Sequence, residues 1–242
     1  MGGIYNDILS AKSKKEKLLA VLIDPEKIKI HQIPLFFEKV HQSIATHIFV
    51  GGSTNFLNNT ETVVTAIKNT THLPVILFPG DVSQVTKCAD GLLFLSLLSG
   101  RNPEYLIEQQ VKSVPILVTM RLEIIPTGYI LVDGQKETAV QKVSNTKPIS
   151  QTNIDLIVNT SLAGQYLGKK LIYLEAGSGA LNVINQKIIN RVSEHLSIPL
   201  IVGGGIRNKQ QLNNAFDAGA DLVVIGTAFE NDLSFFNELK KQ

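Results

Sequence analysis

Short apolar runs that end near glycine, aspartate or serine return eight times along the 242-residue chain. The runs are LLAVLID (18–24), HIFVGGS (47–53), PVILFPG (74–80), GLLFLSLLSG (91–100), EIIPTGYILVDG (123–134), KLIYLEAG (170–177), PLIVGGG (199–205) and DLVVIGT (221–227). Helical patterns separate most of them, as in 182–196 and 208–220. Strands rich in Val, Ile and Leu that alternate with helices indicate a parallel sheet buried on both faces. Eight such units predict an α/β fold, a (β/α)8 TIM barrel, as a single domain over residues 1–242.

Two segments depart from a regular repeat. The run 114–120 could be read as a ninth strand, but Pro103 suits a first helical turn, and we interpret 114–120 as the last turns of that helix. The connection 81–90 between the third and fourth strands has room for only a turn or two of helix, whereas a crossover normally needs at least ~10–12 residues. We therefore expect a shortened or missing helix here, which leaves an apolar groove on the barrel wall.

Composition narrows the class of protein. Hydrophobic residues make up 44% and charged residues 18%, which argues against disorder, and the net charge of +2 is too small to indicate nucleic-acid binding. Cys88 is the only cysteine, so a disulfide framework is excluded, and its expected role is that of a small buried hydrophobe. The N-terminus lacks the order of a signal peptide, and no apolar run approaches 18 residues. We expect a cytoplasmic protein without stable membrane insertion.

Glycine clusters follow the last three predicted strands. GSG (177–179), GGGIR (203–207) and GT (226–227) stand at these ends, and the last two are expected to open helices whose N–H groups favour an anion. A lone glycine would more readily be assigned to a tight turn. Three clusters at consecutive strand ends predict a phosphate site, with Arg207 a candidate assistant or, equally, an exposed helix residue.

Two acids lie at strand ends. Alternation along the sixth strand places Leu171, Tyr173 and Glu175 on one face and the residues between them on the other. Asp24 ends the first strand, and no basic residue nearby in sequence is an evident partner. A hard cation such as Mg²⁺ is therefore the better candidate, with Ser53 as a second oxygen ligand or, alternatively, a helix N-cap.

The motifs LIDPEK, VGGST, LFLSLLSGRNP, IPTGYILVDG, YLEAGSGA, VGGGIR and AGADLVVIGTA together resemble the geranylgeranylglyceryl phosphate synthases over residues 18–230. The resemblance implies a Mg²⁺-dependent prenyltransferase that joins sn-glycerol 1-phosphate to geranylgeranyl diphosphate, with Glu175 as the base, and a homo-oligomer. It assigns Mg²⁺ to Asp24 and Ser53, and it assigns glycerol phosphate to Tyr173, Leu174, Glu175, Ala176, Gly177, Ser178, Gly179, Gly204, Gly205, Gly226 and Thr227.

Alternatives remain open at this stage. A bacterial branch that uses heptaprenyl chains has a motif more like Tyr-x-Glu-Tyr-Ser-Gly, so Ala176 and the glycine after it favour the geranylgeranyl branch. A sugar-phosphate isomerase would use Asp24 and Asp133, whereas a non-catalytic phosphate sensor would keep the glycine clusters but would need neither Glu175 nor Asp24. Lys27 and Arg101 are candidate diphosphate contacts or surface residues. Tyr105 is a candidate stop for the far end of a prenyl chain.

Overall fold

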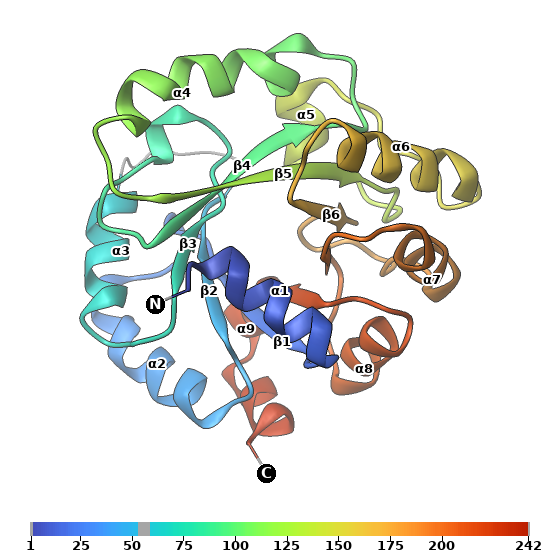
Figure 1. The fold of residues 1–242 in the computed structure, drawn as a ribbon. Coiled ribbons are helices and arrows are strands. Elements are labelled where there is room, and N and C mark those ends of the chain that lie inside the picture. Colours follow the sequence, from blue (N-terminus) through green and yellow to red (C-terminus); the bar gives the residue numbers. More distant parts are fainter. Residues whose placement is uncertain (1, 53–58, 242) are drawn as a thin grey trace.

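The fold is a barrel of parallel strands, shown in Figure 1 as a computed structural model that describes residues 2–52 and 59–241. Within those residues, eight strands pair in chain order and the last pairs back to the first, so the barrel is closed. The strands are β1 (Leu18–Ile23), β2 (His47–Val50), β3 (Val75–Leu77), β4 (Gly91–Leu97), β5 (Glu123–Leu131), β6 (Leu171–Glu175), β7 (Leu200–Gly203) and β8 (Leu222–Ile225). Each lies within one predicted run, and the TIM-barrel prediction is confirmed.

Helices surround most of the barrel. They are α1 (Ile4–Lys14), α2 (Ile33–Gln42), α3 (Thr60–Lys68), α4 (Gln109–Leu117), α5 (Ala139–Ser144), α6 (Ile154–Tyr166), α7 (Gln186–His195), α8 (Lys209–Asp217) and α9 (Thr227–Asn231), with 3₁₀ turns at Ile30–Gln32, Val82–Gln84 and Leu233–Leu239. A π-helical turn, Glu104–Glu108, leads directly into α4. The run 114–120 begins in α4, so its interpretation as the end of a helix rather than a strand is confirmed.

The first helix closes one end of the barrel. α1 precedes β1 and lies across the N-terminal ends of the strands (Figure 1), where Ile8 is fully buried among the residues of the barrel interior. Glu123, the first residue of β5, accepts hydrogen bonds from the N–H groups of Ile4 and Tyr5 and so holds the start of this helix. A ligand therefore reaches the barrel from the opposite end, where the strands finish.

The wall of the barrel is thin between β3 and β4. The two strands are joined through a single 3₁₀ turn, Val82–Gln84, which confirms the predicted loss of a helix. Their pairing covers only Ile76 with Gly91 and Leu77 with Leu92. β4 continues to Leu97 and pairs there with β5 alone. Cys88, in this connection, packs against the core and is half-buried rather than fully buried.

Two apolar layers hold the barrel together. Leu171 and Tyr173 of β6 face the interior cluster, whereas Ile172 and Leu174 face the layer between strands and helices. All four are fully buried. This is the alternation predicted from the sequence, and it continues to Glu175, whose side chain therefore points into the barrel.

Candidate active site

Glu175 is a buried acid at the open end of the barrel. It is the last residue of β6 and is only 6% exposed. One of its carboxylate oxygens accepts a 2.7 Å hydrogen bond from the N–H of Gly177. Burial raises the pKa of Glu175, and this effect exceeds the opposing ones of the Tyr173 hydroxyl and the Gly177 N–H. A carboxylate with a raised pKa in a cleft is suited to accept a proton from a substrate.

Three aromatic rings lie beside this acid. Ring centroids are 5.3 Å apart for Phe78 and Tyr173, 5.4 Å for Tyr129 and Tyr173, and 5.8 Å for Phe78 and Tyr129. Burial, and then the charge of Glu175, raise the pKa of both tyrosines well above the usual value, so both stay neutral. The Tyr173 hydroxyl lies near the carboxylate of Glu175. Among the described residues, it has no hydrogen-bond partner with normal geometry. Aromatic faces next to a carboxylate favour a group that carries positive charge.

The glycines after β7 make room for the acid. An added Cβ at Gly203 would lie 2.7 Å from one oxygen of Glu175 and 2.5 Å from the Tyr173 hydroxyl. An added Cβ at Gly204 would lie 2.5 Å from the other oxygen, and the φ of Gly204 is +88°, which side chains rarely adopt. A side chain at either position would therefore crowd the buried carboxylate, and one at Gly204 would also lie 2.6 Å from the backbone nitrogen of Gly177.

The loops after β6, β7 and β8 meet at this edge, as predicted. The hydroxyls of Ser178 and Thr227 are 3.1 Å apart. The Arg207 guanidinium donates to the carbonyl oxygens of Gly179, at 3.4 Å, and Ala180. Arg207 is exposed, and its hydrogen bonds connect the loop after β7 to the loop after β6.

One expectation about these loops is wrong. GT opens α9 at Thr227, but GGGIR opens no helix directly, because α8 begins only at Lys209. Asn208 caps that helix by accepting a 2.9 Å hydrogen bond from the N–H of Gln211. The glycine turn itself, with positive φ at Gly204 and Gly205, borders the mouth after β7.

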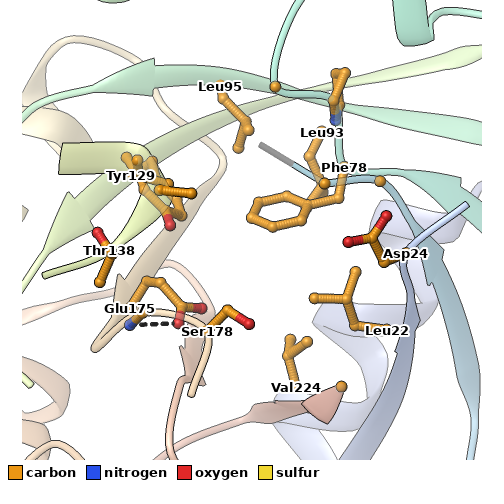
Figure 2. A pocket seen from close by; sticks show the side chains of 18 of the residues that line it. Leu22, Asp24, Phe78, Leu93, Leu95, Tyr129, Thr138, Glu175, Ser178 and Val224 are labelled. Carbon is orange, nitrogen blue, oxygen red and sulfur yellow. Dashed lines mark hydrogen bonds between the residues drawn. The ribbon is translucent and has the colours of Figure 1, made fainter. Parts of the chain in front are cut away.

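Asp24 lies across the mouth from Glu175 (Figure 2). Its side chain is 22% exposed and accepts a 3.0 Å hydrogen bond from the N–H of Glu26. Lys27 Nζ is 3.5 Å from the carboxylate of Asp24 and 2.9 Å from that of Glu230. The expectation that Asp24 has no basic partner nearby in sequence is therefore wrong, since the turn after β1 brings Lys27 back toward it.

A cavity of about 450 Å³ joins the two acids and continues through the barrel wall. Leu93 and Leu95 border it with side chains that point into the barrel (Figure 2), and Leu92 and Phe94, from the outer face of the same strand, also line it. Both faces of β4 contribute because the short β3 leaves its edge open. We call the part beyond the wall the apolar arm, and its lining residues include Val82, Val85, Tyr105, Gln110, Ser113 and Val143.

Most of the predicted site residues line this one cavity. They are Asp24, Tyr173, Glu175, Gly177, Ser178, Gly179, Gly204, Gly205, Gly226 and Thr227, together with Lys27, Tyr105 and Arg207. Leu174 and Ala176 are fully buried in the layer between strands and helices, so their side chains face away from it. Ser53 lies outside the described residues.

Two other candidates lie elsewhere in the described chain. Arg101 does not line the cavity, and its guanidinium donates to the carbonyl oxygens of Leu98 at 3.1 Å and Gly100 at 2.6 Å. Asp133 does not line it either, and its carboxylate accepts a 2.8 Å hydrogen bond from the N–H of Gln135. The geometry therefore gives no support to an isomerase that would use Asp24 and Asp133 together.

Several cavity residues were not identified from the sequence. Tyr129 occupies an inward position of β5, which alternation along that strand could have found. Thr138 begins α5 with a capping box that includes Gln141, a recognisable helix-start signal. Its methyl group packs so closely on Gly177 that a Cβ there would lie 2.0 Å away. Phe78 carries no such signal, because only closure of the barrel brings it to the two tyrosines.

Comparisons with known proteins identify the family of this chain. The model of the PcrB family matches residues 11–242. The geranylgeranylglyceryl phosphate synthase of Zunongwangia profunda is 60% identical over 96% of this chain and 98% of its own, and the protein of the same name from Flavobacterium johnsoniae is 53% identical over 97% and 96%.

A solved structure agrees over the whole fold. The crystal structure of (S)-3-O-geranylgeranylglyceryl phosphate synthase from Thermoplasma acidophilum, in complex with sn-glycerol-1-phosphate, has a TM-score of 0.92 at 34% identity, covering 99% of this chain and 96% of that one. A thiamine phosphate pyrophosphorylase from Pyrococcus furiosus, at 14% identity and a TM-score of 0.56, shares the fold alone. The resemblance noted in the sequence is confirmed, and the chain belongs to the PcrB family.

Proposed function

We propose that this chain is a geranylgeranylglyceryl phosphate synthase. It joins the 3-hydroxyl of sn-glycerol 1-phosphate to C1 of geranylgeranyl diphosphate and releases diphosphate. The observation that carries the proposal is a single cavity with Glu175 and the glycine loops on one side, Asp24 on the other and an apolar arm through the wall. The names of the relatives and the ligand of the Thermoplasma acidophilum structure support the same activity.

Glycerol phosphate is assigned to the glycine side of the cavity. The turns around Gly177, Gly179 and Gly204 let the backbone come close to a phosphate, and the paired hydroxyls of Ser178 and Thr227 offer further donors. This position brings the glycerol 3-hydroxyl toward the carboxylate of Glu175. The buried Tyr129 and Tyr173 remain neutral there, so Glu175 is the member of these three that can be negatively charged and accept a proton.

Glu175 acts as the base of the reaction. Its carboxylate accepts the proton of the 3-hydroxyl while that oxygen bonds to C1 of the prenyl chain. The bond from C1 to the diphosphate oxygen breaks at the same time, and diphosphate leaves with the electron pair. Phe78 and Tyr129 lie at the same cavity, and their aromatic surface would stabilise a carbon that becomes partly cationic as this bond breaks.

The residues around Asp24 fit a bound Mg²⁺. Mg²⁺ is typically held by one or two carboxylates and completes its shell with water and substrate phosphates. Asp24 offers a partly exposed carboxylate inside the cavity, and Ser53 remains a predicted second ligand. Bound Mg²⁺ supplies charge neutralisation for a leaving diphosphate. Lys27, ion-paired to both Asp24 and Glu230, adds positive charge on the same side.

The apolar arm is assigned to the prenyl chain. A packed barrel interior has no room for twenty carbons, whereas the opening beside β4 leads outward along apolar side chains. Ala176, which distinguishes this sequence from the heptaprenyl branch, is fully buried on the outer face of β6 and does not line this arm. The assignment of a twenty-carbon chain therefore depends on the similarity to named relatives rather than on a contact of Ala176.

The test is a direct synthesis. Purified protein, sn-glycerol 1-phosphate, labelled geranylgeranyl diphosphate and Mg²⁺ should give label in an acid-stable ether lipid, and omission of glycerol phosphate should abolish it. Failure to form such a product with prenyl diphosphates of any length would refute the proposal. Tight binding of glycerol phosphate without turnover would instead identify a phosphate sensor.

A further inference from the structure

A buried glutamine stands in the turn that replaces the missing helix. Gln84 ends the 3₁₀ turn Val82–Gln84 and is only 1% exposed. Its side-chain oxygen accepts a 2.7 Å hydrogen bond from the N–H of Gly80, and its side-chain nitrogen donates a 3.0 Å hydrogen bond to the carbonyl oxygen of Gly52. One amide group therefore joins the segment after β3 to the segment after β2.

The amide occupies the place of the next hydrogen bond between β2 and β3. Near the end of this pair, the N–H of Phe78 donates to the carbonyl oxygen of Val50 at 2.8 Å. In a parallel pair, the following bond in the same direction would lie two residues further along both strands, from the N–H of Gly80 to the carbonyl oxygen of Gly52. The side chain of Gln84 stands between these two groups and bonds to both, so it connects the strand ends and also holds them apart.

Gly52 in turn lies against the carboxylate of Asp24. A Cβ added to Gly52 would be 3.0 Å from one carboxylate oxygen and 3.2 Å from the other. The position of the Gly52 backbone therefore limits how the carboxylate can turn. Gly52 and Asp24 both line the cavity, whereas Gln84 does not, so Gln84 acts on a ligand only through the residues that it holds.

The order of the strands sets the direction of the effect. β2 lies between β1 and β3, so Gly52 has Asp24 on one side and Gly80 on the other. Without the amide, the carbonyl oxygen of Gly52 would be free to pair directly with the N–H of Gly80. This pairing would draw Gly52 toward β3 and away from the Asp24 carboxylate.

We propose that Gln84 is a positioning residue for the Mg²⁺-dependent binding of diphosphate. The inference rests on the proposed function, in which Asp24 holds Mg²⁺ beside the leaving diphosphate. The amide of Gln84 fixes Gly52, and Gly52 restricts the carboxylate of Asp24. Groups that orient a metal ligand without touching the metal typically contribute about 10–100-fold to metal affinity.

The first test measures the affinity of Gln84→Ala for two ligands. Calorimetric titration of the full chain with inorganic diphosphate in Mg²⁺ should give a dissociation constant about 10–100-fold above that of the wild type. Titration with sn-glycerol 1-phosphate should give the wild-type value, because that ligand is assigned to the glycine loops across the cavity. Unchanged diphosphate affinity, or an equal loss for both ligands, overturns the proposal.

Gln151→Ala is the matched control. The side-chain nitrogen of Gln151 donates to the carbonyl oxygens of Asp133 at 2.8 Å and Val183 at 3.2 Å, and its side-chain oxygen accepts a 2.9 Å hydrogen bond from the N–H of Asn185. This amide also joins two loops, but it does not line the cavity. The control should bind diphosphate as the wild type does. A loss equal to that of Gln84→Ala would overturn the proposal, because any such bridge would then have the same effect.

The second test determines whether Gln84 acts through Gly52. Gly52→Ala places a Cβ against the Asp24 carboxylate and should itself weaken diphosphate binding in Mg²⁺. If the two residues form one connection, the double variant should lose less affinity than the product of the two single losses. A loss equal to that product overturns the route through Gly52.

Neither titration requires turnover, so the role of Gln84 and the proposed function can fail separately. A chain that shows the expected losses of diphosphate affinity but forms no ether lipid would support the role of Gln84 and refute the proposed function. A wild type that forms ether lipid but binds no diphosphate in Mg²⁺ would overturn the role of Gln84 and leave the proposed function in place.

Discussion

Replacing Glu175 by glutamine should remove most of the activity without weakening the fold. Glutamine keeps the size of the side chain, and its amide oxygen can accept the hydrogen bond that Glu175 accepts from the Gly177 N–H at 2.7 Å. It cannot take a proton from the glycerol hydroxyl. A positioned base contributes typically ~10²–10⁴-fold to a rate, which corresponds to about 2.7–5.4 kcal/mol of activation free energy. We expect kcat to fall by a factor in this range while glycerol phosphate binds as before.

The same substitution has a second, opposite consequence for stability. Burial raises the pKa of Glu175 above its ordinary value of 4.5, so the folded chain keeps this proton to higher pH than the unfolded chain. Wild-type stability therefore falls as the pH rises from about 4.5 through the folded pKa, because the folded state then binds more protons than the unfolded state. Glutamine does not titrate. The melting temperature of Glu175→Gln, relative to the wild type, should rise across this window and show no gain below it.

Both consequences can be measured on the same samples. Single-turnover formation of labelled ether lipid gives the rate, calorimetric titration gives glycerol phosphate affinity, and thermal melts from acidic to neutral pH give stability. Asp133→Asn is the matched control, since it neutralises a carboxylate after the neighbouring strand that does not line the cavity. Near-wild-type turnover in Glu175→Gln would refute the base assignment, and a variant less stable at every pH would refute the account of the buried charge.

The acidic limb of the wild-type profile of kcat/KM against pH should lie above 4.5, the ordinary pKa of a glutamate, because burial raises that of Glu175; a limb at or below 4.5 contradicts this. Gly203→Ala should lower kcat at least about tenfold, since its Cβ would displace the Glu175 carboxylate or the Tyr173 hydroxyl, at a stability cost of roughly 1–3 kcal/mol; an unchanged kcat would show that both side chains can move freely. EDTA should abolish activity, and Asp24→Asn should weaken Mg²⁺-dependent diphosphate binding more than glycerol phosphate binding in titrations; equal loss of both would indicate a folding defect instead. Tyr105→Ala should admit prenyl diphosphates longer than twenty carbons, measured as relative kcat/KM, whereas Tyr105→Phe should keep the wild-type chain-length profile; the same profile in both variants removes Tyr105 as the stop.

Local patterns were enough to place the main acid. Alternation along β6 put Glu175 inside the barrel and at its open end, and counting residues between β3 and β4 located the missing helix. The same alternation already assigned Leu174 and Ala176 to the outer face of the strand. Not every residue of the family motif therefore points its side chain toward the ligand. The side chains of these two residues do not line the cavity.

Other features depend on how segments turn in space. Lys27 approaches Asp24 because the chain after Pro25 turns back. GGGIR is a glycine turn rather than the start of a helix, since α8 begins only after its cap, Asn208. Phe78 meets the tyrosines only because the closed barrel brings three strand ends together. Lys27 is only three residues from Asp24, so this pair was within reach of the sequence, whereas the contacts of Phe78 have no period or spacing there.

The two halves of the site are built differently, because only the side with the apolar arm is a departure from the regular barrel. The side with Glu175 is built on β6 and β7, which pair with each other through Glu175 and Gly203, so the base is held by a continuous ladder. The side with the apolar arm exists because β3 ends at Leu77 and leaves the edge of β4 open. A proton transfer needs a fixed distance, whereas a flexible hydrocarbon chain needs apolar space without strict geometry. The position of the missing helix, away from the paired strands that hold Glu175, lets one barrel meet both requirements.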